Sequence, residues 1–196
     1  MQPIDTGKAY DQITHLWQRE GFDRTNGIAQ HQKALSYVKN RGLALDVGCG
    51  CTGRFIDLML DHDFTPLGID ISDKMLQLAA DRHPDIQFIK TDICQWQSPD
   101  KFDFISAWDS IWHVPMVQQA ALMTKLMSLL NDGGVLIFSA GGLEESQEHT
   151  DDAMGVEVYY STLGFKKNLA LIEECGCVCH YVERELHCYF IVQKLS

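Results

Sequence analysis

The spacing of apolar and polar positions changes repeatedly along the chain after residue 42. Short, mostly apolar runs typical of buried strands stand between stretches whose apolar residues recur every three to four positions, as on one face of a helix. The expected strands of this first kind are 43–47, 66–70, 86–90, 102–107 and 135–139. Strands that alternate with helices predict a parallel sheet covered on both faces, which is the Rossmann-like doubly wound α/β class.

The end of the chain departs from this alternation. After a helical pattern from about residue 163 to 174 come two apolar runs, 177–182 and 186–192, which only Glu183, Arg184 and Glu185 separate. A link this short joins antiparallel strands. The chain therefore predicts a seven-stranded sheet, mostly parallel, with a C-terminal antiparallel hairpin. The dinucleotide-binding fold with six parallel strands does not end in this way.

Several residues mark where the expected helices begin and end. Thr52 is an expected N-cap of the helix that carries Phe55, and Ser72 is an expected N-cap of the next helix. Pro115 suits the first turn of a long helix, which we expect Gly133 and the glycine after it to stop.

Residues 1–41 contain two further amphipathic stretches, one with Tyr10 and Trp17 and a second around Leu35. We interpret them as a helical cap beside the sheet. A chain of 196 residues suits one well-packed domain. The expected organisation is thus a single domain over 1–196, with a cap at 1–41 and a Rossmann-like core at 42–196.

The composition of the chain restricts the classes of binding partner to expect. The net charge is −11, and no run of Lys or Arg is longer than the pair Lys166–Lys167, which disfavours nucleic acid as a partner. No apolar stretch of 18 residues is present, and residues 1–5 lack the basic and apolar regions of a signal peptide. We expect a soluble cytoplasmic protein, monomeric or homodimeric, with no membrane partner and a small molecule as its substrate.

The seven cysteines fit reduced thiols better than disulfides. Cys175, Cys177 and Cys179 stand two positions apart, whereas zinc sites usually leave two to four residues between paired cysteines. The same spacing is typical of a strand whose side chains alternate between two faces. We therefore expect no metal site.

The most informative segment is 45–53 (LDVGCGCTG), where an apolar strand runs into three glycines. Glycines at a strand-to-helix turn let the backbone adopt a sharp turn and approach a ligand closely. The following helix then points its N-terminal amides at that ligand. The pattern Gly48-x-Gly50-x-x-Gly53 is also the nicotinamide-dinucleotide fingerprint, so the loop alone allows either of two cofactor classes.

The segments around this loop resemble the class I S-adenosylmethionine (SAM)-dependent methyltransferases, in particular their compact, small-molecule, type 11/12-like branch. The resemblance covers nearly all of the chain from Leu43 to Lys194. The matching segments are 45–50 (LDVGCG), 68–72 (GIDIS), 91–93 (TDI), 102–105 with 108–115, 130–136 (LNDGGVL) and 171–177 (LIEECGC). One departure is that Gly53 stands one residue later than the third glycine of many family members, which makes it an expected helix-packing position.

The resemblance implies SAM as cofactor, with Asp70 on the ribose hydroxyls and Asp92 on the adenine amino group. The full set of cofactor-binding residues it implies is Asp46, Gly48, Cys49, Gly50, Asp70, Ile71, Met75, Asp92, Ile93, Ala107 and Trp108. The chemistry of the residues agrees in part. Asp70 serves the ribose of either cofactor, whereas Asp46 beneath the loop would repel a pyrophosphate and suit the cationic end of SAM.

Methyl transfer from a sulfonium needs alignment and exclusion of water, and a base only when the acceptor must lose a proton. Candidate catalytic residues follow the fourth strand: His113 as base and Asp109 as its orienter, four positions apart. The alternative is that His113 only begins a helix and Asp109 binds loop amides.

Residues 140–160 are polar and acidic, and they follow a strand at the end of the sheet that faces the ligand, so we expect a lid there. The candidate acceptor-binding residues are Tyr10, Trp112, His149, Tyr159 and Tyr160. The function expected is transfer of a methyl group from SAM to a small molecule by in-line displacement. The alternatives are a nicotinamide-dependent oxidoreductase and a non-catalytic SAM-binding protein.

Overall fold

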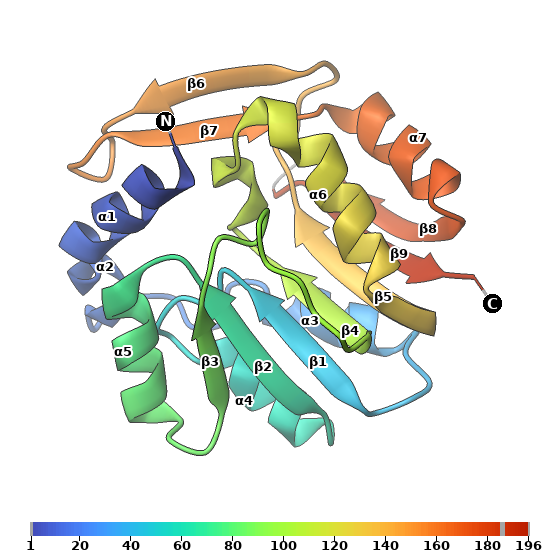
Figure 1. The fold of residues 1–196 in the computed structure, drawn as a ribbon, viewed down its shortest axis with the longest axis horizontal. Coiled ribbons are helices and arrows are strands. Elements are labelled where there is room, and N and C mark those ends of the chain that lie inside the picture. The colour runs from blue at the N-terminus through green and yellow to red at the C-terminus, as the bar shows by residue number, and fades with distance from the viewer. Residues whose placement is uncertain (1, 185–186, 196) are drawn as a thin grey trace.

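A computed structural model describes residues 2–184 and 187–195. Its main sheet has seven strands in the order β3-β2-β1-β4-β5-β9-β8 (Figure 1). The strands are β1 (Leu43–Val47), β2 (Thr65–Asp70), β3 (Gln87–Lys90), β4 (Phe102–Ala107), β5 (Leu130–Ser139), β8 (Cys177–Glu183) and β9 (Tyr189–Lys194). The strands β1 to β5 pair in parallel, and β9 is antiparallel to both β5 and β8. The predicted fold class, including the antiparallel pair at the end of the chain, is confirmed.

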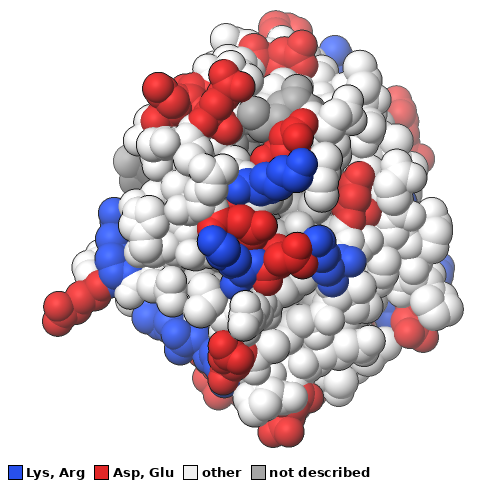
Figure 2. Space-filling model, turned by 60° about the vertical axis from the view of Figure 1, so that its left-hand side comes forward, with Lys and Arg blue, Asp and Glu red and all other residues white. Residues whose placement is uncertain are grey.

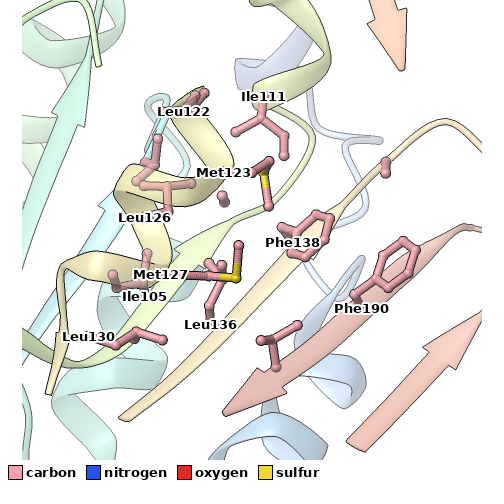
Figure 3. Packing of buried hydrophobic residues seen from close by; sticks show 14 of the residues in the cluster. Ile105, Ile111, Leu122, Met123, Leu126, Met127, Leu130, Leu136, Phe138 and Phe190 are labelled. Carbon is pink, nitrogen blue, oxygen red and sulfur yellow. The ribbon is translucent and has the colours of Figure 1, made fainter. Parts of the chain in front are cut away.

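Helices cover both faces of this sheet (Figure 1). They are α1 (Pro3–Ile13), α2 (His15–Gln18), α3 (Ile28–Leu35), α4 (Arg54–Asp61), α5 (Asp73–Arg82), the 3-10 helix η1 (Ile111–His113), α6 (Met116–Ser128) and α7 (Phe165–Glu174). Alternate residues of one strand supply the two hydrophobic cores. Leu136 and Phe138 of β5 pack toward α6 (Figure 3), whereas Val135 and Ile137 pack with α3 and α4. This is the period-two alternation that a strand buried on both faces requires.

The start of β5 differs from the prediction. The helix α6 ends at Ser128, and β5 begins two residues later, so the two glycines lie inside the strand rather than at the helix end. Leu130 is fully buried and pairs with Phe102, which continues the sheet through this stretch. Gly133 has a φ of +76°, and the pairing shifts register between Phe102 and Phe104. The glycines therefore allow an irregularity in the strand.

The segment expected as a lid forms a second, two-stranded sheet of β6 (Gln147–Asp151) and β7 (Val158–Thr162). Sequence patterning predicted no strand here, because β6 is mostly exposed and carries no apolar alternation. The sheet is held to the core by Gln119 of α6, whose Nε2 donates to the carbonyl of Ser161 at 2.9 Å and to its Oγ at 2.7 Å. The lid is thus a docked hairpin.

The N-terminal cap contains three helices rather than two, because α1 and α2 are separate elements. The helix α1 lies between α5 and the small sheet (Figure 1). Asp11 of α1 accepts hydrogen bonds at the start of α5, from Oγ of Ser72 at 2.5 Å and from the amide of Lys74 at 3.0 Å. A carboxylate at a helix N-terminus is stabilised by the free amides and the helix dipole. None of the helices in the described ranges has both the length and the apolar character that crossing a bilayer requires.

Candidate functional site

The loop after β1 is pressed against the loop after β4. The amides of Gly48 and Cys49 donate to the carbonyl of Ile69 at 2.8 and 3.0 Å, which fixes the turn to β2. Gly48 has a φ of +69°, and a Cβ there would stand 2.4 Å from Cβ of Ser110. Gly50 has a φ of +57°, but no atom lies within 4 Å of where its Cβ would be. The backbone at Gly50 is therefore open to a ligand, as the glycine pattern predicts.

The third glycine has a different surrounding. Gly53 has a φ of +69°, and a Cβ there would stand 2.4 Å from Cε1 of His83 at the end of α5. This agrees with the helix-packing role expected for Gly53. It is also the N-cap residue of α4, where Thr52 was predicted. The hydroxyl of Thr52 instead accepts a hydrogen bond from Nη1 of Arg54 at 2.9 Å.

Asp70 joins the two strand-end loops. Its Oδ2 accepts from the amide of Gly50 at 2.9 Å, and its Oδ1 accepts from the amide of Ser72, also at 2.9 Å. Burial raises the pKa of the Asp70 carboxyl, and these amides oppose the rise. Each carboxylate oxygen has a second lone-pair site, so Asp70 can still accept two hydroxyl hydrogen bonds.

A crevice lies over the ends of β1 to β4, at the edge where open parallel sheets bind ligands. The lining residues from the core are Val47, Gly48, Ile69, Asp70, Ile71, Thr91, Asp92, Ile93, Asp109, Ser110, Ile111, His113 and Val114. Pro3, Thr6 and Tyr10 of α1 cover it. Oδ1 of Asp92 accepts from the amide of Cys94 at 2.9 Å, which forms an aspartate turn, and the carboxylate also contacts the Cys94 thiol.

A second pocket continues the crevice toward the N-terminal cap. Both spaces are lined by Tyr10, Gly48, Asp70, Asp109 and His113, so they form one cleft. The residues that line only the second pocket are Trp17, Phe22, Asn26, Cys49, Gly50, Thr52, Arg54, Phe55, Met75, Trp108, Trp112, Met154 and Tyr160. On the side of the molecule that carries α1, α2 and α5, acidic and basic side chains are interspersed (Figure 2).

His113 stands where the two spaces meet, and both of its ring nitrogens are engaged. Nδ1 lies 2.8 Å from the carbonyl of Tyr159, which can only accept, so Nδ1 carries the proton. The lone pair of Nε2 then receives the indole N–H of Trp112 at 3.1 Å and the hydroxyl of Tyr10 at 2.7 Å. Burial lowers the pKa of His113 to about 4. The imidazole is neutral with its lone pair occupied, which does not suit a general base.

Among the described residues, no hydrogen bond joins Asp109 to His113, so Asp109 does not orient the imidazole as predicted. The carbonyl of Tyr159 orients it instead. Asp109 has a φ of +54° and precedes η1, so the two residues do not share a helical turn. Its amide donates to Oγ of Ser139 at 2.6 Å, and its Oδ1 lies 2.8 Å from Nε2 of His187.

Sequence reasoning missed His187, which comes from the C-terminal hairpin. Its ring stacks on Trp108 with 4.8 Å between centroids. No spacing in the sequence relates it to Asp109, because sheet pairing brings the two together.

A buried polar chain lies beneath the glycine loop. Asp46 is 2 % exposed, and burial raises its pKa to about 7 while the hydroxyl of Ser106 opposes the rise. Oγ of Ser106 also lies 3.0 Å from Nε2 of His31, whose Nδ1 contacts the carbonyl of Gly27 at 2.7 Å. Burial lowers the pKa of His31 to about 3. Asp46 and Ala107 lie behind the cleft rather than in its lining. No pattern in the sequence indicated His31 or Ser106.

The predicted acceptor residues separate into two groups. Tyr10, Trp112 and Tyr160 line the second pocket. The hydroxyl of Tyr159 instead accepts from the amide of Met116 at 3.0 Å and contacts Glu148, so this side chain fastens the hairpin to α6. His149 is exposed and stacks on Tyr160 with 5.2 Å between centroids. Adjacent strand residues point to opposite faces, which explains why Tyr159 and Tyr160 differ.

The strand order, the glycine loop after β1 and the acid after β2 define a Rossmann-like α/β protein with a nucleotide-type cleft. A family model described as a methyltransferase domain matches residues 44–134. The chain also matches the solved complex of DhpI with S-adenosylhomocysteine (SAH), with a TM-score of 0.74 and 16% sequence identity. The match covers 99% of this chain and 97% of that one. SAM-bound CalS10, an amino pentose methyltransferase from Micromonospora echinaspora, matches with a TM-score of 0.70 and 17% sequence identity. That match covers 92% of this chain and 95% of CalS10. The resemblance to the class I SAM-dependent methyltransferases is confirmed: the chain has their fold, and residues 44–134 match the methyltransferase-domain model.

Curated relatives match over parts of their length. Trans-aconitate 2-methyltransferase of Agrobacterium fabrum is 38% identical over 93 residues, which are 46% of this chain and 35% of that protein. The enzyme of the same name from Escherichia coli O157:H7 is 36% identical over 103 residues, 50% and 39% of the two chains. An uncharacterized methyltransferase of Alkaliphilus oremlandii is 24% identical over 155 residues, 74% and 71%. The chain thus spans little more than a third of the two trans-aconitate enzymes.

Proposed function

We propose that this chain is a SAM-dependent methyltransferase that acts on a small molecule. The cofactor lies in the crevice with its amino-acid end reaching the second pocket, where the acceptor binds. The observation that carries the proposal is the position of Asp70. Its carboxylate stands in the lining of both spaces and is held between the loops after β1 and β2 by the amides of Gly50 and Ser72.

The residues present fit such a cofactor. Oγ of Ser110 is buried in the crevice lining with no hydrogen-bond partner among the described residues, which favours a polar ligand at that point. Asp70 has the acceptor capacity for the two ribose hydroxyls, and the lone-pair sites that remain on the Asp92 carboxylate beyond its contacts with Cys94 suit an exocyclic amine. Ile71 and Ile93 supply apolar walls for a base between them. When bound, SAM supplies a methyl group on a sulfonium, which is a reactive donor that needs no activation by the protein.

The remaining predicted cofactor residues have two kinds of role. Cys49, Met75 and Trp108 line the second pocket next to the glycine loop and would shape the wall at the amino-acid end of the cofactor. Asp46 and Ala107 support the loop from behind. Asp46 is held there by the hydroxyl of Ser106 and does not line the cleft.

His113 and Tyr10 act as a pair in this proposal. The hydroxyl of Tyr10 donates its hydrogen bond to Nε2 of His113, so the phenol oxygen can only accept hydrogen bonds from the cleft. His113 is then a positioning residue, and Tyr10 accepts a hydrogen bond or a polarised C–H from the reacting groups. Burial raises the pKa of Tyr10 far above its usual range, so it stays a neutral phenol.

The relatives support a small acceptor, because by their names they act on trans-aconitate and on an amino pentose. The cleft supports it too, since the docked hairpin and the cap enclose the second pocket through Tyr160 and Trp17. Cytoplasmic location and a monomeric or homodimeric state stay predictions.

The test is calorimetric titration with SAH and with NAD in parallel, followed by methyl transfer from labelled SAM to a panel of small metabolites. We expect binding of SAH and not of NAD. Asp70→Asn should weaken SAH binding by about 1 to 3 kcal/mol, since it removes charge-assisted hydrogen bonds. Asp73→Asn is the matched control, because Asp73 is exposed and pairs with Lys90. Binding of NAD alone would overturn the proposal, and SAH binding without transfer to any acceptor would leave a non-catalytic SAM-binding protein.

A further inference from the structure

Arg54 is the only Lys or Arg that lines either part of the cleft within the described residues. It is the first residue of α4, directly after the glycine loop. Its Nε donates to the carbonyl of Asn26 at 3.0 Å and its Nη1 to the hydroxyl of Thr52 at 2.9 Å. The guanidinium carbon lies 4.3 Å from the ring centroid of Phe55. These contacts fix the side chain in one orientation.

This cation has no ion-pair partner in residues 2–184 and 187–195, where no carboxylate oxygen lies within 4.0 Å of it. The nearby acids are engaged elsewhere. Asp46 pairs with Ser106, Asp109 contacts His187, and Asp23 accepts from the amide and hydroxyl of Thr25 at 2.8 and 2.6 Å. The chain has a net charge of −11, yet this half-buried guanidinium forms no ion pair with any acid that the structure describes.

Partial burial of a cation costs free energy, and burial lowers the pKa of Arg54. The more distant charges of Asp46, Asp109 and Asp23 oppose this drop but do not cancel it. A ligand anion in the cleft would remove that cost. The two protein bonds use two of the five N–H donors of the guanidinium, and the three that remain include both on Nη2. Planar donors of this kind bind a carboxylate through two parallel hydrogen bonds.

We propose that Arg54 binds a carboxylate group in the second pocket and that it thereby selects the molecules the cleft accepts. One guanidinium matches the single charge of a carboxylate. A phosphate dianion fits less well, because Asp70 and Asp109 line the same cleft and no second cation does. The carboxylate has two sources: the amino-acid end of the cofactor, or an acidic acceptor. The inference rests on the proposed function, and the experiment separates the two sources.

The experiment compares the wild type with Arg54→Gln and Arg54→Lys. Arg24→Gln is the matched control, because Arg24 is an exposed arginine of the same region that does not line the cleft. Thermal unfolding shows that each variant is folded, and Arg54→Lys keeps the charge should Arg54→Gln fail to fold. The calorimetric probes are SAH, 5′-methylthioadenosine, which lacks the amino-acid end, and succinate, titrated with and without saturating SAH.

If the cofactor supplies the carboxylate, Arg54→Gln weakens SAH about ten- to a hundredfold and leaves 5′-methylthioadenosine unchanged. If an acceptor supplies it, SAH affinity is unchanged and succinate binds the wild type but not Arg54→Gln. Equal losses for both nucleosides would show a packing effect and overturn the proposal, as would unchanged binding of every probe. Failure of SAH to bind the wild type would sink the proposed function, while succinate without SAH still tests Arg54.

Discussion

The hydroxyl oxygen of Tyr10 lies 2.7 Å from Nε2 of His113, so that the first helix of the chain and the loop after β4 meet at the centre of the cleft. Because the lone pair of His113 is occupied, the pair orients groups and does not remove a proton. This arrangement makes the phenol oxygen of Tyr10 a hydrogen-bond acceptor in the lining of the cleft.

Tyr10→Phe should keep the aromatic wall of the cleft and remove the oxygen. We expect kcat to fall about 2- to 12-fold, the equivalent of one hydrogen bond worth 0.5 to 1.5 kcal/mol, with the Kd for SAH nearly unchanged. Steady-state kinetics and calorimetry measure the two quantities. Tyr37→Phe is the control, since Tyr37 stacks on His180 away from the cleft. A Kd that rises as much as kcat falls would show that Tyr10 only packs against the cofactor.

Gly50→Ala should abolish SAH binding without unfolding the protein. The new methyl group meets no protein atom within 4 Å, but it would occupy the space where the loop is open to the ligand. The left-handed φ adds strain of about 1 kcal/mol. Gly133→Ala is the control, because it has a φ of +76° and equally open surroundings, outside the cleft. Equal effects of both variants on SAH affinity would contradict a contact at Gly50.

Much of the frame could be predicted from local pattern. The strands β1 and β4 have the predicted bounds, and Ser72 caps α5 through the amide of Met75 at 3.1 Å. These features depend on residues close in sequence, where apolar spacing and capping chemistry are sufficient. Asp70 and Asp92 could also be placed, because each follows a predicted strand and the carboxyl ends of parallel strands lie at one edge of the sheet.

The partners inside the site could not be predicted, because long-range packing chooses them. His113 is bound by the carbonyl of a residue 46 positions away, and Asp109 by His187 from the last hairpin. The sequence indicated no role for Arg54, because a single arginine at the start of a helix is common. Only the structure reveals that no acid among the described residues forms an ion pair with Arg54.

Gln119→Ala should loosen the hairpin of β6 and β7. The side chain of Gln119 is buried, and its Nε2 is the donor that holds the carbonyl and hydroxyl of Ser161. Leaving those acceptors unpaired costs about 1 to 3 kcal/mol. We expect faster amide exchange over residues 147–162 and a higher KM for the acceptor, measured by mass spectrometry and kinetics. Gln118→Ala on the same helix is the control, and unchanged exchange in the hairpin would contradict the anchor.

Asp11→Asn should weaken the attachment of α1 to α5. The carboxylate accepts from Ser72 and Lys74, at the positive end of the α5 dipole, so its charge contributes about 0.3 to 1 kcal/mol beyond the hydrogen bonds. Because α1 covers the crevice, we expect faster dissociation of SAH in stopped-flow measurements. Asp81→Asn is the control, because Asp81 is exposed near the C-terminal end of α5 and does not line the cleft. A dissociation rate equal to that of the wild type would mean that the cover does not depend on this contact.

Three buried groups should give the free energy of unfolding a pH dependence with opposing parts. The pKa values of His31 and His113 are lowered from 6.5 to about 3 and about 4, so below pH 6.5 the unfolded chain takes up protons that the folded chain excludes. Stability is then lost as pH falls from 6.5 toward 4, by up to about 1.4 kcal/mol per pH unit for each histidine. Asp46 acts the other way. Its pKa is raised from 3.8 to about 7, so the folded chain holds a proton that the unfolded chain releases, and stability is lost as pH rises through that interval.

Urea unfolding between pH 4 and 7.5 separates these contributions through single variants. His113→Gln should flatten the acid side of the profile by the share of one histidine, whatever its effect at neutral pH, because it removes one proton that only the unfolded chain binds. Asp46→Asn should steepen it, since the opposing group is gone. His15→Gln is the control, because His15 is exposed at the start of α2. A His113→Gln profile parallel to that of the wild type would show that His113 is protonated in the folded protein at these pH values, and its lone pair would then not be the acceptor for Tyr10.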